Sequence, residues 1–250
     1  MKSTHVRIVS IIAAAFYASV ISGKAQAFQN LDFESELGSP ISGSPPIGFY
    51  NLPGWNVATV GDQYGASPGG VYYNGTVLDG TGGYVVPAGG YDVITGATIG
   101  PLDGAQSLAL YVSGYEAPAS ISITQTGTIP GGQNSVSFLL GYFATLNLAP
   151  SQNPLNYFSL SINNQNVPLV VTSVDGQVLT VAGNISQWAG KTVTLSIANS
   201  ITENQTESFG VIDDVAFSPQ VVAVPEAFGM GLLTAALSLS AVFLNRRKTA

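Results

Sequence analysis

The side chains that carry out most protein chemistry are scarce in this 250-residue sequence. It has no cysteine, and its one histidine, His5, lies near the N-terminus. Disulfides, thiolate metal sites and cysteine nucleophiles are therefore excluded. Residues 28–223 also contain no histidine and no arginine, so this stretch cannot assemble a Ser-His-Asp triad, a histidine zinc site or an arginine phosphate clamp.

Carboxylates are the reactive groups that remain. Between residues 28 and 223 there are 13 Asp and Glu residues, and Lys191 is the single basic residue, which gives a net charge of −12. This stretch lacks the basic stripe that nucleic-acid binding requires, and we expect no nucleic-acid partner. Two carboxylates could act as acid and nucleophile in glycoside hydrolysis, but no pattern selects a pair. We therefore expect the protein not to be an enzyme.

One carboxylate stands out because of its place in a predicted strand. Period-two alternation places the apolar residues of this segment on the same face as an aspartate: Phe209, Val211, Asp213, Val215 and Phe217. If the Phe and Val side chains form core, Asp213 is buried as well, and a buried carboxylate needs a partner. Two interpretations remain open. Asp213 binds a metal ion, or it accepts hydrogen bonds from backbone N–H groups at a turn or bulge.

The first 27 residues have the organisation of a signal peptide. Lys2 and Arg7 precede an apolar run over residues 8–21, and Ala25 and Ala27 provide the small residues that signal peptidase accepts. We predict cleavage after Ala27. An uncleaved anchor is the alternative, which the shortness of the run disfavours.

The other end of the sequence predicts a membrane-spanning helix. Residues 227–244 contain no charged side chain and would extend about 27 Å as a helix, enough to cross a hydrocarbon core. Arg246 and Arg247 follow at once, and such a basic cluster stays on the cytoplasmic side. We expect everything before the helix to lie outside the cytoplasm.

A short motif precedes this helix: Val224, Pro225 and Glu226. The motif, the helix and the Arg cluster together resemble the PEP-CTERM sorting signal of Gram-negative bacteria, although Ala227 replaces its usual second proline. The resemblance covers residues 221–250. It implies an exosortase-type protease as partner, a transient inner-membrane anchor facing the periplasm, and release to the cell surface or an exopolysaccharide matrix.

Residues 28–220 are predicted to form one all-β domain, an antiparallel β-sandwich. Apolar and polar residues alternate over residues 107–112, 120–124, 156–162 and 192–197. Turn-forming pairs such as Pro53-Gly54 and Asp175-Gly176 separate the predicted strands. No amphipathic helix is predicted in this region, and Trp55 and Trp188 are expected in the core.

Residues 61–100 are rich in glycine and tyrosine, and we predict long surface loops with short strands at 83–86 and 93–99. Aromatic rings stack on the apolar faces of sugars. The tyrosines of this region are therefore candidate ligand-binding residues, with loop packing as their alternative role: Tyr64, Tyr72, Tyr73, Tyr84 and Tyr91.

Several motifs occur in the order found in galactose-binding-like jelly rolls, the fold of many carbohydrate-binding modules. They are N-L-D-F-E at 30–34, L-P-G-W at 52–55, D-G-A-Q-S-L-A-L at 103–110, I-T-Q-T at 123–126 with I-P-G-G at 129–132, and F-G-V-I-D-D-V-A-F at 209–217. The resemblance implies a jelly roll with carbohydrate binding. It also implies a structural calcium ion held by Glu34 and by Asp213 or Asp214.

The sequence thus predicts an exported cell-envelope or matrix protein, sorted by an exosortase-type system, whose jelly-roll domain binds carbohydrate. The alternative is a purely structural surface protein without a small ligand. A carboxylate-pair glycoside hydrolase is the least favoured function.

Overall fold

The structure is a computed structural model, and it describes residues 26–35, 40–44, 47–61, 71–73, 81–87, 90–91, 98–112, 117–142, 153–202 and 207–223. Residues 1–25 of the predicted signal peptide (1–27) and residues 224–250 of the predicted sorting signal (221–250) lie outside these residues. Within them, no helix has the length and apolar character needed to span a membrane.

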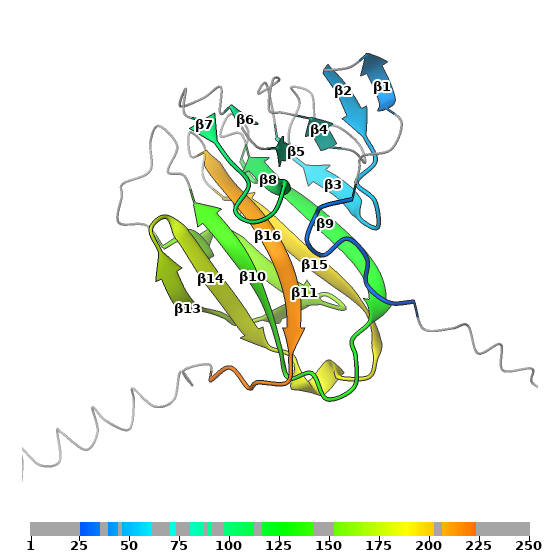
Figure 1. Cartoon of the computed structure of the whole chain (residues 1–250), viewed down its shortest axis with the longest axis vertical. Coiled ribbons are helices and arrows are strands. Elements are labelled where there is room, and N and C mark those ends of the chain that lie inside the picture. The colour runs from blue at the N-terminus through cyan, green and yellow to red at the C-terminus, as the bar shows by residue number, and fades with distance from the viewer. Residues whose placement is uncertain are drawn as a thin grey trace, which may run out of the picture.

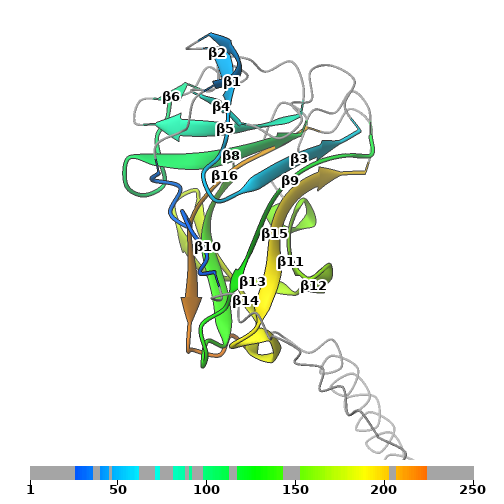
Figure 2. The ribbon, with the colours of Figure 1, turned by 90° about the vertical axis from the view of Figure 1, so that its right-hand side faces the viewer.

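Two sheets pack face to face, which confirms the predicted β-sandwich (Figures 1 and 2). The larger sheet has nine strands, in the spatial order β1 (Pro40–Ser44), β2 (Ile47–Tyr50), β4 (Val71–Tyr73), β5 (Gly82–Pro87), β8 (Gln106–Val112), β16 (Ser208–Ser218), β10 (Ser135–Tyr142), β14 (Val178–Asn184) and β13 (Leu169–Asp175). Its pairs are antiparallel except β4 with β5, which is parallel.

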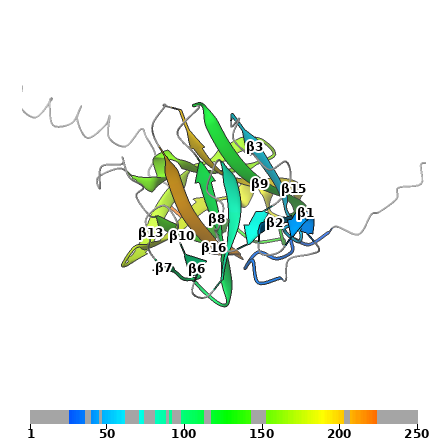
Figure 3. The same cartoon turned by 90° about the horizontal axis from the view of Figure 1, so that it is seen from above.

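The smaller sheet has five strands, in the order β12 (Gln165–Val167), β11 (Phe158–Ile162), β15 (Thr192–Ile201), β9 (Ala119–Thr128) and β3 (Asn56–Val60). Figure 3 shows β16, β10 and β13 on one side of the sandwich and β9, β15 and β3 on the other. A separate pair joins β6 (Gly90–Tyr91) to β7 (Thr98–Ile99), and two short 3₁₀ turns, η1 (Pro154–Asn156) and η2 (Ser186–Trp188), are the helical elements of the described chain.

The predicted alternation is clearest in β9 and β15, the longest pair of the smaller sheet. Val193, Leu195 and Ile197 are at most 2% exposed, while the Thr and Ser residues between them face outward. Both tryptophans are buried, as predicted. The core is therefore built from the inward-facing residues of both sheets.

The prediction of loops over residues 61–100 is partly wrong. Strand β5 covers the predicted strand at 83–86, and β7 overlaps the one at 93–99, but β4 and β6 are strands that the sequence did not predict. These strands are three and two residues long, which is too short to show an alternating pattern.

The segment that opens the described chain, residues 26–35, ties the two sheets together. The Phe28 ring packs against Phe217 of β16 at a centroid distance of 5.3 Å. Gln125 of β9 holds Gln29 through two hydrogen bonds: its Nε2 donates to the Gln29 carbonyl (2.9 Å), and its Oε1 accepts from the Gln29 N–H. This segment therefore contacts β16 of the larger sheet and β9 of the smaller sheet.

Gly210 of β16 is required where the two sheets approach each other. A Cβ atom there would lie 2.5 Å from the Phe158 ring of β11. We expect Gly210→Ala to lower the free energy of unfolding by about 1–3 kcal/mol, because the added methyl overpacks the core. Urea denaturation measures this. Gly131→Ala is the control, since its Cβ would meet no atom within 4 Å, and equal stability of the two variants would contradict the prediction.

Candidate functional site

The carboxylate of Glu34 binds the loop that leads into β8. Its Oε1 accepts hydrogen bonds from the N–H groups of Ala105 (2.7 Å) and Gln106 (3.2 Å). Gly104 makes this approach possible, because its φ is +59° and a Cβ atom there would lie 2.0 Å from Oε1. The Gln106 side chain returns the contact by donating to the Phe33 carbonyl at 2.8 Å.

A β-bulge in β16 changes which face its residues occupy. Ala216 pairs with Ser137 and Asp213 with Leu139, so two residues of β16 lie opposite one residue of β10. Asp214, in the bulge, has a φ of +52°. The predicted single face is therefore wrong. Phe209 and Val211 belong to a second cluster, on the outer face of the larger sheet, whereas Val215 packs in the main core.

Asp213 is buried, as predicted, with 1% of its surface exposed. Its Oδ2 accepts hydrogen bonds from the Ser107 hydroxyl and from the Asp103 N–H, the latter at 3.2 Å. Its Oδ1 accepts from the Asp214 N–H at 2.8 Å. Burial raises the pKa of Asp213 to about 6, and the three hydrogen bonds oppose this rise. These hydrogen bonds are those of the second interpretation, in which backbone N–H groups at a bulge hold the carboxylate, and the metal-ion interpretation stays a prediction.

The predicted calcium ligands, Glu34, Asp213 and Asp214, do not form a cluster of three acidic side chains. Across the described parts of the chain, no three His, Cys, Asp or Glu side chains lie close enough together to hold a metal ion. The Glu34 and Asp213 carboxylates accept hydrogen bonds from the chain itself, and Asp214 is exposed. These residues do not form a ready-made oxygen cage, and structural calcium stays a prediction.

The five predicted ligand-binding tyrosines do not lie in one element of the structure. Tyr64 lies outside the described residues, Tyr72 and Tyr73 lie in β4, and Tyr91 lies in β6. Tyr84 is 2% exposed in β5, so its ring is not open to solvent for stacking on a sugar. Of the sorting and cleavage residues, Ala27 is described and exposed, whereas Ala25, Val224, Pro225, Glu226, Arg246 and Arg247 are outside the described chain.

Tyr84 belongs to an aromatic cluster on the outer face of the larger sheet. Its ring centroid lies 6.5 Å from that of Tyr111, which lies 6.4 Å from that of Phe209. Burial raises the pKa of the nearby Glu207, and a hydrogen bond with Tyr111 opposes the rise. All three rings are at most 3% exposed, which gives this cluster the character of a second small core.

The smaller sheet carries a polar surface that the tyrosine argument missed. The outer face of the smaller sheet, which we call the hydroxyl face, carries one amide and eleven hydroxyl side chains: Asn56, Ser120, Ser122, Thr124, Thr126, Thr128, Ser159, Ser161, Thr192, Thr194, Ser196 and Ser200. The remaining outward positions of these four strands, β3, β9, β11 and β15, hold Ala58, Val60 and Ala198. No outward side chain of the four strands is therefore charged.

Strand pairing sets these hydroxyls in rows. Asn56 of β3, Thr124 of β9 and Ser196 of β15 are neighbours across three strands, and Ser161 of β11 extends the row. Thr126 and Thr194 share a hydrogen bond between hydroxyls at 2.9 Å. The sequence signal was the Ser and Thr at every second position of β9 and β15.

Comparisons with known proteins identify no family. The chain matches no family model, and no curated protein matches its sequence. Among solved structures, an apo cyclase from Fischerella sp. is 13% identical, with a TM-score of 0.41 and coverage of 76% of this chain and 93% of the cyclase. The carbohydrate-binding module TmCBM61, solved with beta-1,4-galactotriose, is 12% identical, with a TM-score of 0.34 and coverage of 77% and 98%.

These similarities are too low to transfer an activity, but they correct one prediction. A Stig cyclase from Fischerella sp. TAU, solved in complex with a pyrrolidinylidene-indole, is also similar, at 13% identity and a TM-score of 0.40 over 76% of this chain and 94% of its own. The expectation that this chain is not an enzyme is withdrawn, because the similar solved structures include cyclases, which are enzymes. The similarity assigns no activity to this chain. The absence of cysteine, and of histidine between residues 28 and 223, excludes particular mechanisms rather than catalysis as a class.

The raised pKa of Asp213 predicts a pH dependence of stability. Its pKa is about 6 in the folded state against an ordinary 3.8, so the folded state binds the proton more tightly than the unfolded chain. This stabilisation is complete below about pH 3.8 and is lost as pH rises through about 6, and it amounts to about 3 kcal/mol. Melting temperatures of wild type and Asp213→Asn between these pH values should show a shallower slope for the variant.

Asp175→Asn is the control, because it makes the same substitution at an exposed position of the β13–β14 turn. The melts are made in EGTA, so that no bound cation contributes. Equal slopes for Asp213→Asn and wild type would show that Asp213 does not titrate in this range. Repeating the wild-type melt with calcium tests the predicted ion, since a melting temperature that calcium does not raise would argue against it.

Proposed function

We propose that the chain is an exported bacterial cell-envelope or matrix protein whose sandwich associates with neutral polysaccharides through the hydroxyl face. The single observation that carries the proposal is the hydroxyl face itself, a charge-free array across four strands of a domain whose chain otherwise has a net charge of −12 between residues 28 and 223. Signal peptidase and an exosortase-type protease would process its two ends.

The chemistry of this face suits sugars. Hydroxyl and amide groups both donate and accept hydrogen bonds, as sugar hydroxyls do, and the interaction requires no charge. Neighbouring strands lie about 4.8 Å apart, and outward residues repeat about every 6.7 Å along a strand. A linear polymer can therefore contact several rows at once, and many weak contacts add through avidity.

The negative charge of the rest of the domain restricts the class of polysaccharide that it can bind. Anionic polysaccharides would be repelled by the acidic surface, whereas neutral ones would not. The burial of Tyr84, Tyr111 and Phe209 also favours a broad polar surface over an aromatic sugar pocket. If no polysaccharide binds, the same features support the alternative of a purely structural matrix protein.

The processing part of the proposal predicts two new termini. Mass spectrometry of the protein released by a host that carries an exosortase should find an N-terminus at Phe28 and a C-terminus near Glu226. Deleting residues 227–250 should abolish membrane retention before release, because no apolar anchor remains. Recovery of the chain only as a full-length membrane species would contradict release.

The binding part predicts that a charge placed on the hydroxyl face weakens polysaccharide association. In affinity electrophoresis, the domain should be retarded in gels that contain hydroxyethylcellulose or β-1,4-galactan but not alginate. The double variant T126E/T194E should lose most of this retardation, because two carboxylates replace a hydrogen-bonded hydroxyl pair and each must be desolvated on contact.

The matched control is V174E, which adds a carboxylate at a position 65% exposed on β13, away from the hydroxyl face. It should keep the wild-type retardation. Equal retardation of the control and the double variant, or no retardation of wild type by either neutral polymer, would reject polysaccharide binding at this face.

A further inference from the structure

Both ends of the described chain lie at the same end of the sandwich, which we call the basal end. It consists of the first described residues, the β9–β10 turn, η2 with its flanks, and the segment after β16: residues 26–28, 128–134, 185–192 and 218–223. Hydrogen bonds join these pieces. The Thr128 N–H donates to the Gln26 carbonyl at 2.8 Å, and the Asn134 Nδ2 donates to the Pro219 carbonyl at 2.7 Å.

The predicted membrane segments connect to this end. Residue 25 precedes Gln26, and only three residues separate Ala223 from the predicted helix that begins at residue 227. Four residue steps span at most about 14 Å even when fully extended. While the helix crosses the bilayer, Ala223 must therefore lie within about that distance of the start of the span.

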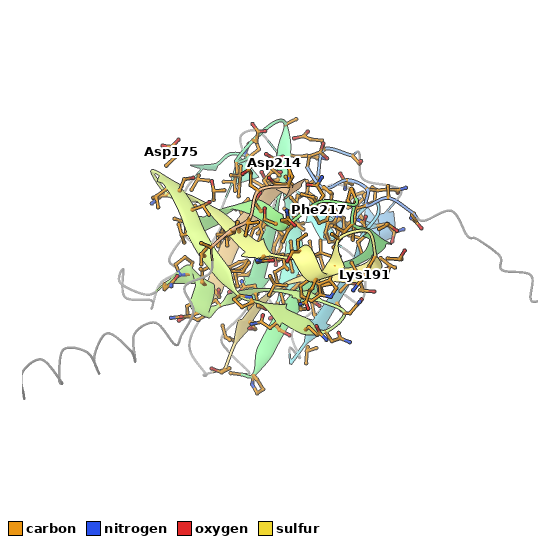
Figure 4. All side chains as sticks on the ribbon, turned by 90° about the horizontal axis from the view of Figure 1, so that it is seen from below. Asp175, Lys191, Asp214 and Phe217 are labelled. Atoms are coloured by element: carbon orange, nitrogen blue, oxygen red, sulfur yellow. The ribbon has the colours of Figure 1, made fainter. Side chains whose placement is uncertain are left out.

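The basal end also differs in charge from the rest of the domain. None of its residues is Asp or Glu, and it carries Lys191, the single basic residue between positions 28 and 223. The Lys191 carbonyl accepts from the Ile129 N–H at 3.0 Å, which fixes its backbone beside the β9–β10 turn. Figure 4 views the molecule from below and shows Lys191 well separated from Asp175 and Asp214.

Three described carboxylates, those of Asp175, Asp213 and Asp214, lie away from the basal end. Asp213 and Asp214 are on β16 four or more residues before its last residue, Ser218, and Asp175 ends β13 at the turn to β14. Strand β14 leads from that turn back to Asn184, next to the basal end, over seven residues or about 23 Å. This is more than two Debye lengths at physiological ionic strength.

We propose that the basal end faces an anionic membrane surface while the C-terminal helix is anchored, so that Lys191 contacts lipid headgroups and the carboxylates of Asp175 and Asp214 lie away from them. The inference rests on the proposed function, because it requires the helix to be in the bilayer. A lysine near an anionic surface gains about 1 kcal/mol, and carboxylates brought to the same surface would be repelled. The short connection to the helix and the charge of Lys191 therefore favour the same orientation, with the basal end toward the membrane.

The test uses the full chain in vesicles. Because the sequence has no cysteine, single-cysteine variants can be labelled without background. Gln187→Cys, at the basal end, and Gln177→Cys, at the β13–β14 turn, form a matched pair, since both replace an exposed glutamine. A fluorophore on each is quenched by a spin label on the lipid headgroup in phosphatidylcholine vesicles with or without phosphatidylglycerol.

Quenching should be several-fold stronger at position 187 than at 177, and the ratio should fall without the anionic lipid. Equal quenching at both positions, or a ratio that phosphatidylglycerol does not change, overturns the inference. Flotation separates this failure from that of the proposed function. A chain that does not float with the vesicles has no membrane anchor, whereas a floating chain with equal quenching is anchored without the proposed orientation.

Discussion

The buried carboxylate of Asp213 is the interaction on which the arrangement of the loops depends. An ionised carboxylate inside a protein is costly unless several donors surround it. Here three donors do so, and two of them, Asp103 and Ser107, come from the segment that enters β8. That segment in turn offers its next N–H groups to Glu34. One aspartate thus fixes a loop, and the loop fixes the segment that opens the domain.

Charge is distributed so that it plays little part elsewhere in the fold. The core is mostly apolar, the outer face of the smaller sheet presents hydroxyls, and Lys191 lies at the basal end, where the described chain begins and ends. A domain with this composition cannot rely on ion pairs for stability, and in any case exposed ion pairs contribute little. Sheet packing and hydrogen bonds must hold it together, which is consistent with the long β9–β15 ladder.

The strands with strict alternation could be predicted from the sequence because one of their faces is solvated. This holds for β9 and β15. The burial of Trp55 and Trp188 was also predicted from the sequence. The same reasoning fails for β16. The bulge at Asp214 shifts the alternation of its side chains, and the pattern of apolar residues does not show that Asp214 has a positive φ. The reasoning also fails for Tyr84, since alternation does not reveal that the outer face of the larger sheet is covered as well.

The position of β16 has a consequence for the proposed export. The last strand of the described residues, β16, lies between β8 and β10, near the middle of the nine-stranded sheet, so that sheet cannot be completed until β16 is present. Contacts between residues this distant in sequence form slowly. On the export route proposed above, a chain threaded through a translocon from its N-terminus would remain incompletely folded until β16 had crossed, and its unpaired strands would be exposed to chaperones and proteases on the far side.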